Sequence, residues 1–428
     1  MKRKLFRKTA AFSSFCLAWL ILATPLSADE KSDYSFYINA LENLKDTKFS
    51  NILIDQIREY VMRYPDAQNL DDMQFLIATL YNNNKHELES FVAHTELIYL
   101  YPDSKHLEVA KDRVRSLLMR KKKFKPLREQ TEAILQPALV DSTSEGRFYS
   151  FIKNLFDLRF APVTKMLIEA CDRFLTKYPS TRKSEEVLYW KAELLNLDRQ
   201  YRQALATYMK LTFLYKKSIL VTSSKLRMAS LFTNKLEKHQ NAILTLEEFL
   251  VEYPEDPQAG FALLTMAKII EKKKKKPLEA LEAYLDVAKK YPKSLEAVPA
   301  LFEAARLYED KFKEYDQAIR VYTQVVRDFG DDIKAPYALA EAGRIYEKEL
   351  KDYANAANVY YKIFEQYPDN RLAPEYLYKA AEIYEKKLQD LDQALAHYRK
   401  IVDNYPNEKI AEKASKKIDK INKAANHQ

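Results

Sequence analysis

The chain has 428 residues, of which 47% are hydrophobic and 31% charged, so it can bury a sizeable core. Only 4 residues are glycine, far below the roughly 7% of average proteins, which excludes glycine-rich phosphate-binding loops and folds rich in tight turns. The formal net charge of +9 is concentrated at the N-terminus, and what remains is too small to indicate nucleic-acid binding.

The first 28 residues have the layout of a secretory signal peptide. Five basic side chains precede an apolar stretch from Ala10 to Ala23, and Leu26-Ser27-Ala28 offers a small-residue cleavage site. We therefore predict export to the periplasm with cleavage near Ala28; an uncleaved membrane anchor is the alternative. Cleavage would remove five positive charges and no negative one, leaving 65 basic and 61 acidic residues and a net charge of +4. Cys16 lies inside the apolar stretch rather than at its end, so we expect no lipidation.

Ten repeating units follow between Asp29 and Tyr405. Their junctions carry Tyr-Pro or a degenerate form of it. From Tyr215 onward the junctions recur every 38 residues, at positions 215, 253, 291, 329, 367 and 405. A period of this length is typical of a solenoid built from helical hairpins.

The units differ in regularity along the chain. Residues 29–138 have lost most of the repeated residues, whereas residues 139–405 keep them. The turn-like segment Asp141–Gly146 lies near this change, and we place a bend or a boundary there. Residues 406–428 are rich in Lys and Glu, with small and apolar residues at helical spacing, which predicts a capping helix over the last repeat; these residues are Ile410, Ala414, Ile418 and Ile421.

Two columns of residues recur inside the units and define a pair of helices, A and B. Helix A carries a small residue at the same place in successive units, at Ala229, Ala267, Ala305, Gly343 and Ala381. Helix B carries an alanine, followed one helical turn later by a large side chain that is usually tyrosine; the alanines are Ala204, Ala242, Ala280, Ala318, Ala356 and Ala394. Small residues let two helices approach closely, and the rings fill the space beside them. A proline then ends most B helices, because it cannot donate a backbone hydrogen bond.

These residues resemble the tetratricopeptide repeat family. The small-x-x-Tyr pattern of helix A is similar to residues 381–384, the Ala-x-x-x-aromatic pattern of helix B to Ala394 and Tyr398, and the following proline to Pro406. The long unit resembles bacterial envelope members, namely the tetratricopeptide lipoprotein of the outer-membrane β-barrel assembly machine and the Tol-Pal-associated periplasmic cell-division coordinator. The resemblance implies an all-α, right-handed superhelical solenoid of about ten helical hairpins with a C-terminal capping helix.

The resemblance also places one face of helix A on a concave groove that holds a partner. The predicted contact residues are Phe302, Arg306, Glu309, Arg344, Glu347, Tyr378 and Glu382. Arg306 and Arg344 occupy the same position in adjacent units, where each could hold a partner's carboxylate by two hydrogen bonds. Phe302 and Tyr378 would supply apolar anchors. The alternative is that each arginine only pairs along its own helix, with Glu309 and Glu347 at i,i+3 spacing.

Motifs for chemistry are missing from the sequence. It contains no Walker loop, nucleophile elbow, His-Glu-x-x-His or paired-cysteine motif, so we predict no enzyme activity, no metal site and no cofactor. His94 and Cys171 align with the aromatic column of helix B, which predicts packed interior side chains rather than a metal ligand or a reactive thiol. The run Lys272–Lys276 falls between two predicted helices. It indicates a solvated turn or, alternatively, contact with a membrane surface or an acidic partner.

Together these observations favour a periplasmic scaffold or adaptor in cell-envelope biogenesis, with association to the outer membrane left open. Its groove would hold a segment of a protein or peptide of the envelope. One alternative is a secretion adaptor for polysaccharide or pilus export. Another is an enzyme acting on the cell wall, although no segment outside the repeats is long enough for a catalytic domain.

Overall fold

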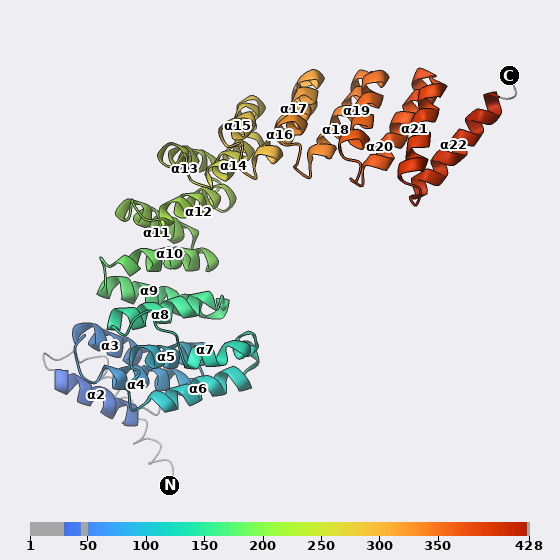
Figure 1. The fold of residues 1–428 in the computed structure, drawn as a ribbon. Helices are drawn as coiled ribbons and strands as arrows, with labels where there is room; N and C mark the ends of the chain where they lie inside the picture. The colour runs from blue at the N-terminus through green and yellow to red at the C-terminus, as the bar shows by residue number, and fades with distance from the viewer. Residues whose placement is uncertain (1–29, 44–49, 426–428) are drawn as a thin grey trace, which may run out of the picture. The chain divides into compact units, whose positions relative to one another are not determined.

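The computed structural model describes residues 30–43 and 50–425. Over these residues the protein is all-α, and consecutive helices pack as hairpins, as the 38-residue period predicted (Figure 1). The predicted signal peptide, residues 1–28, lies outside the described residues. The chain divides into two compact units, unit 1 (Met1–Ser224) and unit 2 (Lys225–Gln428).

Unit 1 contains the first five hairpins, the third of which is irregular. Its helices are α2 (Glu30–Asn43), α3 (Ser50–Arg63), α4 (Leu70–Asn83), α5 (Glu87–Leu100), α6 (Leu107–Arg120), η2 (Lys122–Gln130), α7 (Thr131–Leu135), α8 (Ser144–Asp157), η3 (Ala161–Val163), α9 (Thr164–Lys177), α10 (Arg182–Leu197) and α11 (Tyr201–Leu214). The next helix, α12 (Leu220–Asn234), crosses from unit 1 into unit 2.

Helix α5 is enclosed by its neighbours in unit 1. Every side chain from Ser90 to Tyr99 is buried, and α5 packs against α4, α6 and α8. The prediction that His94 is an interior residue is confirmed, since the side chain is 3% exposed and its Nδ1 lies 2.7 Å from the Ser90 carbonyl oxygen. The thiol of Cys171 in α9 is also fully buried, as predicted.

The third hairpin has lost most of its second helix. After α6 the chain forms the 3₁₀ helix η2, which contains Pro126, and then α7, which has only 5 residues. Proline removes a backbone donor and clashes with the preceding turn, so a full α-helix cannot form there. As a result α5 packs directly against α8. The compact units divide further along the chain, between Ser224 and Lys225.

Unit 2 continues with regular hairpins. Its helices are α13 (His239–Glu252), α14 (Ala259–Lys272), α15 (Pro277–Lys290), α16 (Ala297–Leu307), η4 (Tyr308–Phe312), α17 (Tyr315–Asp328), α18 (Ala335–Ile345), η5 (Tyr346–Leu350), α19 (Tyr353–Gln366), α20 (Ala373–Ile383), η6 (Tyr384–Leu388), α21 (Leu391–Asn404) and α22 (Lys409–Ala425). The A helices α16, α18 and α20 each end in a π turn, namely η4, η5 and η6.

The predicted columns form the core of unit 2. The small residues of the A helices and the alanines of the B helices are buried, and so are the tyrosines one turn after those alanines; these tyrosines are Tyr284, Tyr322, Tyr360 and Tyr398. After the last hairpin, α22 packs against α20 and α21 and buries Ala411, Ala414 and Ile421 in their cluster.

Candidate functional site

The A helices of unit 2 expose a narrow strip of side chains to solvent. In α16, for example, only Pro299, Phe302, Glu303 and Arg306 are not buried, because the remaining positions pack between hairpins. The equivalent strips of α14, α16 with η4, α18 with η5, and α20 with η6 form what we call the helix-A face. All seven residues of the predicted contact set lie on this face, and each is partly exposed.

The two predicted aromatic anchors are half-buried and held by neighbouring rings. Phe302 meets the buried Tyr322 edge-to-face, with ring centroids 5.4 Å apart. Tyr378 lies 5.3 Å from the ring of Tyr398. Because rigid helices position both rings, a partner could cover their exposed parts at little cost in side-chain entropy.

Arg306 bonds to carboxylates in two helices. Its Nε donates to Glu303 at 2.8 Å on the same helix, and its guanidinium also reaches Glu271 of α14 at 2.5 Å. A third carboxylate, that of Asp310, lies 3.6 Å away. The expectation that Arg306 pairs only along its own helix, with Glu309, is therefore wrong. Glu309 is three residues away in sequence, but Glu303 and Glu271 take the donors instead.

Arg344 repeats this arrangement one hairpin later. Its Nε donates to Glu341 at 2.7 Å, and its guanidinium reaches both carboxylate oxygens of Glu309 in η4, at 2.6 and 2.7 Å. Its pairing with Glu347 is likewise not observed. Each arginine therefore joins its own A helix to the preceding one, and Glu309 accepts an arginine from the next hairpin.

Buried tyrosines complete the network beneath the face. The hydroxyl groups of Tyr284, Tyr360 and Tyr398 donate to Glu271, Glu347 and Glu385, each 13 residues earlier. Burial alone would raise the pKa of the Glu271 carboxyl, but hydrogen bonds from Arg306 and Tyr284 outweigh it and hold the pKa below its ordinary value. The Glu271 carboxylate is therefore ionised at neutral pH.

The column of arginines stops after Arg344, because the next position in the column is Glu382. This residue occupies in α20 the position that Arg306 and Arg344 occupy in α16 and α18. Glu347, which in a regular unit would receive that arginine, instead accepts hydrogen bonds from Lys348 and Tyr360. Glu382 itself pairs with Lys386 on its own helix. The C-terminal end of the face therefore lacks the arginine bridge that joins the A helices in its middle.

The sequence analysis did not single out three further aromatic residues on this face. Phe261 in α14 and Tyr337 in α18 are 48% and 42% exposed, and Tyr376 in α20 packs 5.0 Å from Tyr360. Phe261 and Tyr337 stand at the same position two units apart, seven residues before the position of Arg344. This shared position was the signal that could have identified them.

The predicted basic turn Lys272–Lys276 is solvent-exposed in all five side chains. Lys276 pairs with Glu279 at 2.7 Å, and Lys275 has a left-handed backbone with φ of 56°. Leu278, just after it, is 59% exposed. The turn is therefore accessible to a partner or a membrane surface, but its side chains do not converge on a single binding point.

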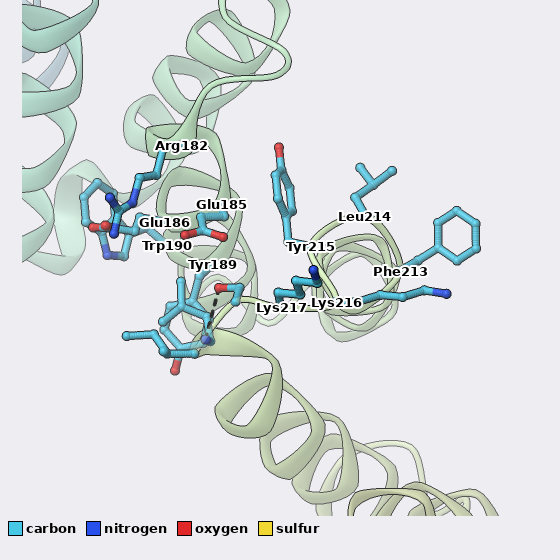
Figure 2. Close-up of a pocket in the computed structure, with 13 residues that line it drawn as sticks. Arg182, Glu185, Glu186, Tyr189, Trp190, Phe213, Leu214, Tyr215, Lys216 and Lys217 are labelled. Carbon is cyan, nitrogen blue, oxygen red and sulfur yellow. Dashed lines mark hydrogen bonds between the residues drawn. The ribbon is translucent and has the colours of Figure 1, made fainter. Parts of the chain in front are cut away.

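Unit 1 carries an open cleft of about 970 Å³ near the end of α11. Figure 2 shows side chains of α10, including Tyr189 and Trp190, on one side, and Tyr215 with the end of α11 on the other. Phe213 in the same segment is 73% exposed, and Ile219 is 88% exposed. Aromatic, aliphatic, basic and acidic side chains all line this cleft, so its lining favours no single ligand chemistry.

A second cavity of unit 1, about 630 Å³, lies between α3, α5 and α9. It exists because the short α7 leaves α9 beside α3 and α5. Arg58 of α3 pairs across it with Glu169 of α9 at 3.3 Å, and Arg173 of α9 bonds to the buried Glu96 of α5 through two hydrogen bonds. These ion pairs join the walls of the cavity.

Groups for metal chemistry are not assembled in the part of the chain that the structure describes. No cluster of three or more His, Cys, Asp or Glu side chains suited to a metal ion occurs among these residues. Within residues 30–43 and 50–425, no helix has the length and apolar character needed to span a bilayer.

The four hairpins that carry the helix-A face match the sequence profile of the tetratricopeptide repeat. The matched stretches are residues 261–294, 299–332, 337–370 and 375–408. This part of the chain, residues 261–408, belongs to the tetratricopeptide-repeat family. The matched repeats span α14 to α21, and four residues separate each stretch from the next. A search of curated proteins finds no match to the chain.

Solved tetratricopeptide-repeat structures resemble the chain at low identity. A tetratricopeptide repeat protein from Parabacteroides merdae is 15% identical, with 63% of this chain and 98% of that chain covered and a TM-score of 0.35. The C-terminal part of a repeat protein from Cytophaga hutchinsonii is 14% identical, with 62% and 98% covered and a TM-score of 0.40. PilF from Pseudomonas aeruginosa is 15% identical, with 55% and 100% covered and a TM-score of 0.35. Similarities this weak carry no information about function.

Proposed function

We propose that this protein is a periplasmic scaffold of cell-envelope biogenesis that binds a segment of an envelope protein on the helix-A face of unit 2. Tetratricopeptide repeats form protein-interaction scaffolds, and this face belongs to the four matched repeats. The observation that carries the proposal is the row of partly exposed aromatic side chains on rigid, ion-paired helices.

The exposed rings give the face the composition of a protein-binding surface. Aromatic and arginine side chains are enriched where proteins bind one another, and few of them supply most of the binding energy. Phe261 and Tyr337 expose nearly half of their surface without a partner ring to cover it. The bridges from Arg306 and Arg344 hold neighbouring A helices in fixed register beneath these rings.

The periplasmic location rests on the sequence of residues 1–28, with its basic start, apolar stretch and Leu-Ser-Ala site. Mature protein purified from the envelope should begin at or near Asp29 and carry no lipid. N-terminal sequencing and intact mass spectrometry measure this directly, and an intact Met1 or an acylated Cys16 would contradict the proposal.

The binding role is tested by capturing partners from envelope extract and then titrating the captured protein against surface variants. Phe261→Ala with Tyr337→Ala should weaken its binding at least tenfold, about 1.4 kcal/mol, and leave the melting temperature unchanged. The control is Leu244→Ala with Val251→Ala, which truncates two exposed apolar side chains of α13, a B helix of unit 2. Equal binding by both variants would place the partner elsewhere. Peptidoglycan turnover by the purified protein would instead favour the enzyme alternative.

A further inference from the structure

Carboxylates of the helix-A face already accept hydrogen bonds from Arg306 and Arg344. This pairing determines which charge the face favours in a partner. We propose that the segment it binds is cationic: an extended stretch with Lys or Arg at every third residue, lying across α16, α18 and α20. This inference rests on the proposed function, because it assigns the chemistry of the partner bound at that same face.

Carboxylates outnumber cations in the middle of the face. The two central A helices with their π turns carry six carboxylates and four cations, and Lys334, which directly precedes α18 and lies over Phe302, adds a fifth cation. The carboxylates are Glu303, Glu309, Asp310, Glu341, Glu347 and Glu349, and the cations are Arg306, Lys311, Arg344 and Lys348. The local excess of negative charge attracts a positively charged segment.

The pairing inside the face disfavours an anionic partner. A partner's carboxylate could bond Arg306 only by displacing Glu271 or Glu303, and would approach Asp310 as it did so. A cation meets no such competition, because each carboxylate has about four acceptor sites and its bond to arginine uses only some of them. The predicted capture of a carboxylate by Arg306 and Arg344 is therefore the less favourable arrangement.

The rings of this face already receive ammonium groups from the chain itself. Lys334 lies 5.9 Å above the ring of Phe302, and Lys379 lies 4.4 Å from the centroid of Tyr376. Cations within about 6 Å of a ring face are attracted by its quadrupole. A partner's lysine or arginine can use the exposed ring of Tyr337 in α18 in the same way.

The spacing of the A helices sets the spacing of the cations. The Glu271–Arg306 and Glu309–Arg344 bridges show that neighbouring A helices lie close together, and packed helices stand about 8–10 Å apart. An extended polyproline II segment returns to the same face every three residues, or about 9 Å. One cation per turn of the bound segment would therefore meet the carboxylates of one hairpin. The last of these hairpins carries Glu382 at the position that Arg306 and Arg344 occupy in the preceding ones.

Three labelled peptides test the proposal by fluorescence anisotropy with the full mature chain. They consist of four Pro-Pro-Lys, four Pro-Pro-Glu or four Pro-Pro-Gln triplets. We expect the lysine peptide to bind at least tenfold more tightly than the other two. Tighter binding of the glutamate peptide, or no binding of the lysine peptide, would overturn the inference.

Variants then separate this face from general charge attraction. Glu341→Gln with Glu382→Gln should weaken the lysine peptide at least tenfold. The control, Glu282→Gln with Glu365→Gln, removes the same charge from exposed positions of α15 and α19 and should change affinity less than twofold. Equal losses in both variants would show non-specific attraction. If the aromatic variants lose the captured partner while the glutamate peptide binds best, the cationic inference fails and the proposed function stands.

Discussion

At the scale of single residues, the connections between helices A and B hold a feature that only backbone geometry reveals. From α10 to α21, each connection contains one non-glycine residue in the left-handed region, and these recur at 38-residue steps: Arg199, Glu237, Lys275, Lys313, Lys351 and Gln389. An L-residue in this conformation brings its Cβ close to the following carbonyl oxygen, at a cost of about 1–2 kcal/mol. With only 4 glycines, the chain accepts this strain in every regular unit.

Replacing such a residue by glycine should therefore stabilise the protein. Lys351→Gly relieves the left-handed strain but adds freedom to the unfolded chain, so we expect a net gain of about 0.5–1 kcal/mol. Urea unfolding measures the change. Lys351→Ala is the control, since alanine keeps the Cβ and should stay within a few tenths of a kcal/mol of wild type. Equal stability of the glycine and alanine variants would show that the turn is unstrained.

His94 makes unit 1 sensitive to acid. Burial lowers its pKa to about 4, against an ordinary value of 6.5. The unfolded chain therefore binds the proton first as pH falls, so stability is full above pH 6.5 and decreases between pH 6.5 and 4 by about 3 kcal/mol in total. Urea unfolding at several pH values should show this decrease in the wild type and a smaller one in His94→Gln. An unchanged pH dependence in the variant would rule out His94 as the titrating group.

At the scale of elements, α18 lacks a side chain at Gly343 where the following A helix, α20, brings in the large side chain of Tyr376. The position of Tyr376 holds alanine in the three preceding A helices, at Ala262, Ala300 and Ala338. Tyr376 packs 5.0 Å from the ring of Tyr360, and a Cβ added at Gly343 would lie 2.4 Å from that same ring. The absent side chain of Gly343 thus gives room to Tyr360.

The compensation predicts a coupled pair of substitutions. Gly343→Ala should destabilise unit 2 by about 1 kcal/mol or more, because overpacking outweighs the better helix propensity of alanine. In a Tyr376→Ala background the ring of Tyr360 can move away, so the same substitution should cost nothing or stabilise. A double-mutant cycle by thermal unfolding measures the coupling, and additive effects would disprove it.

The alanine column of the B helices sets the closest approach between helices. Ala318 and Ala356 are fully buried, so Ala318→Asp or Ala356→Asp would force a carboxylate between packed helices at a cost of about 3 kcal/mol or more. Because each repeat stabilises its neighbours, faster hydrogen exchange should extend beyond the substituted hairpin. Melting within a degree of wild type would mean that this column tolerates a charge.

At the scale of the whole molecule, the last repeat depends on its cap. Helix α22 covers Leu377, Ala381 and Tyr398 of the final hairpin with a small apolar face of its own. Truncation after Pro406 would expose that cluster and remove at least about 3 kcal/mol, the equivalent of one or two buried aliphatic side chains. Hydrogen exchange should then accelerate in α20 and α21 first and least in α14. Uniform protection along unit 2 would contradict a capping role.

The sequence by itself determined the helical hairpin, its repeat length and the packed columns of unit 2. These depend on residues within one unit: small side chains permit close approach, rings one turn away fill the space, and Tyr-Pro ends helix B. The interior positions of His94 and Cys171 followed from the same alignment. Periodic patterns could be read because every regular unit repeats the same local chemistry.

Only the tertiary structure decided which groups meet on the candidate site. Arg306 had a neighbour at i,i+3 spacing in Glu309, yet it bonds Glu303 and also Glu271, 35 residues away. Sequence spacing does not tell whether an arginine bonds a carboxylate on its own helix or one on the preceding A helix. That choice depends on how closely the A helices pack. Exposure of Phe261 and Tyr337, and the direct packing of α5 on α8, likewise depend on contacts between units.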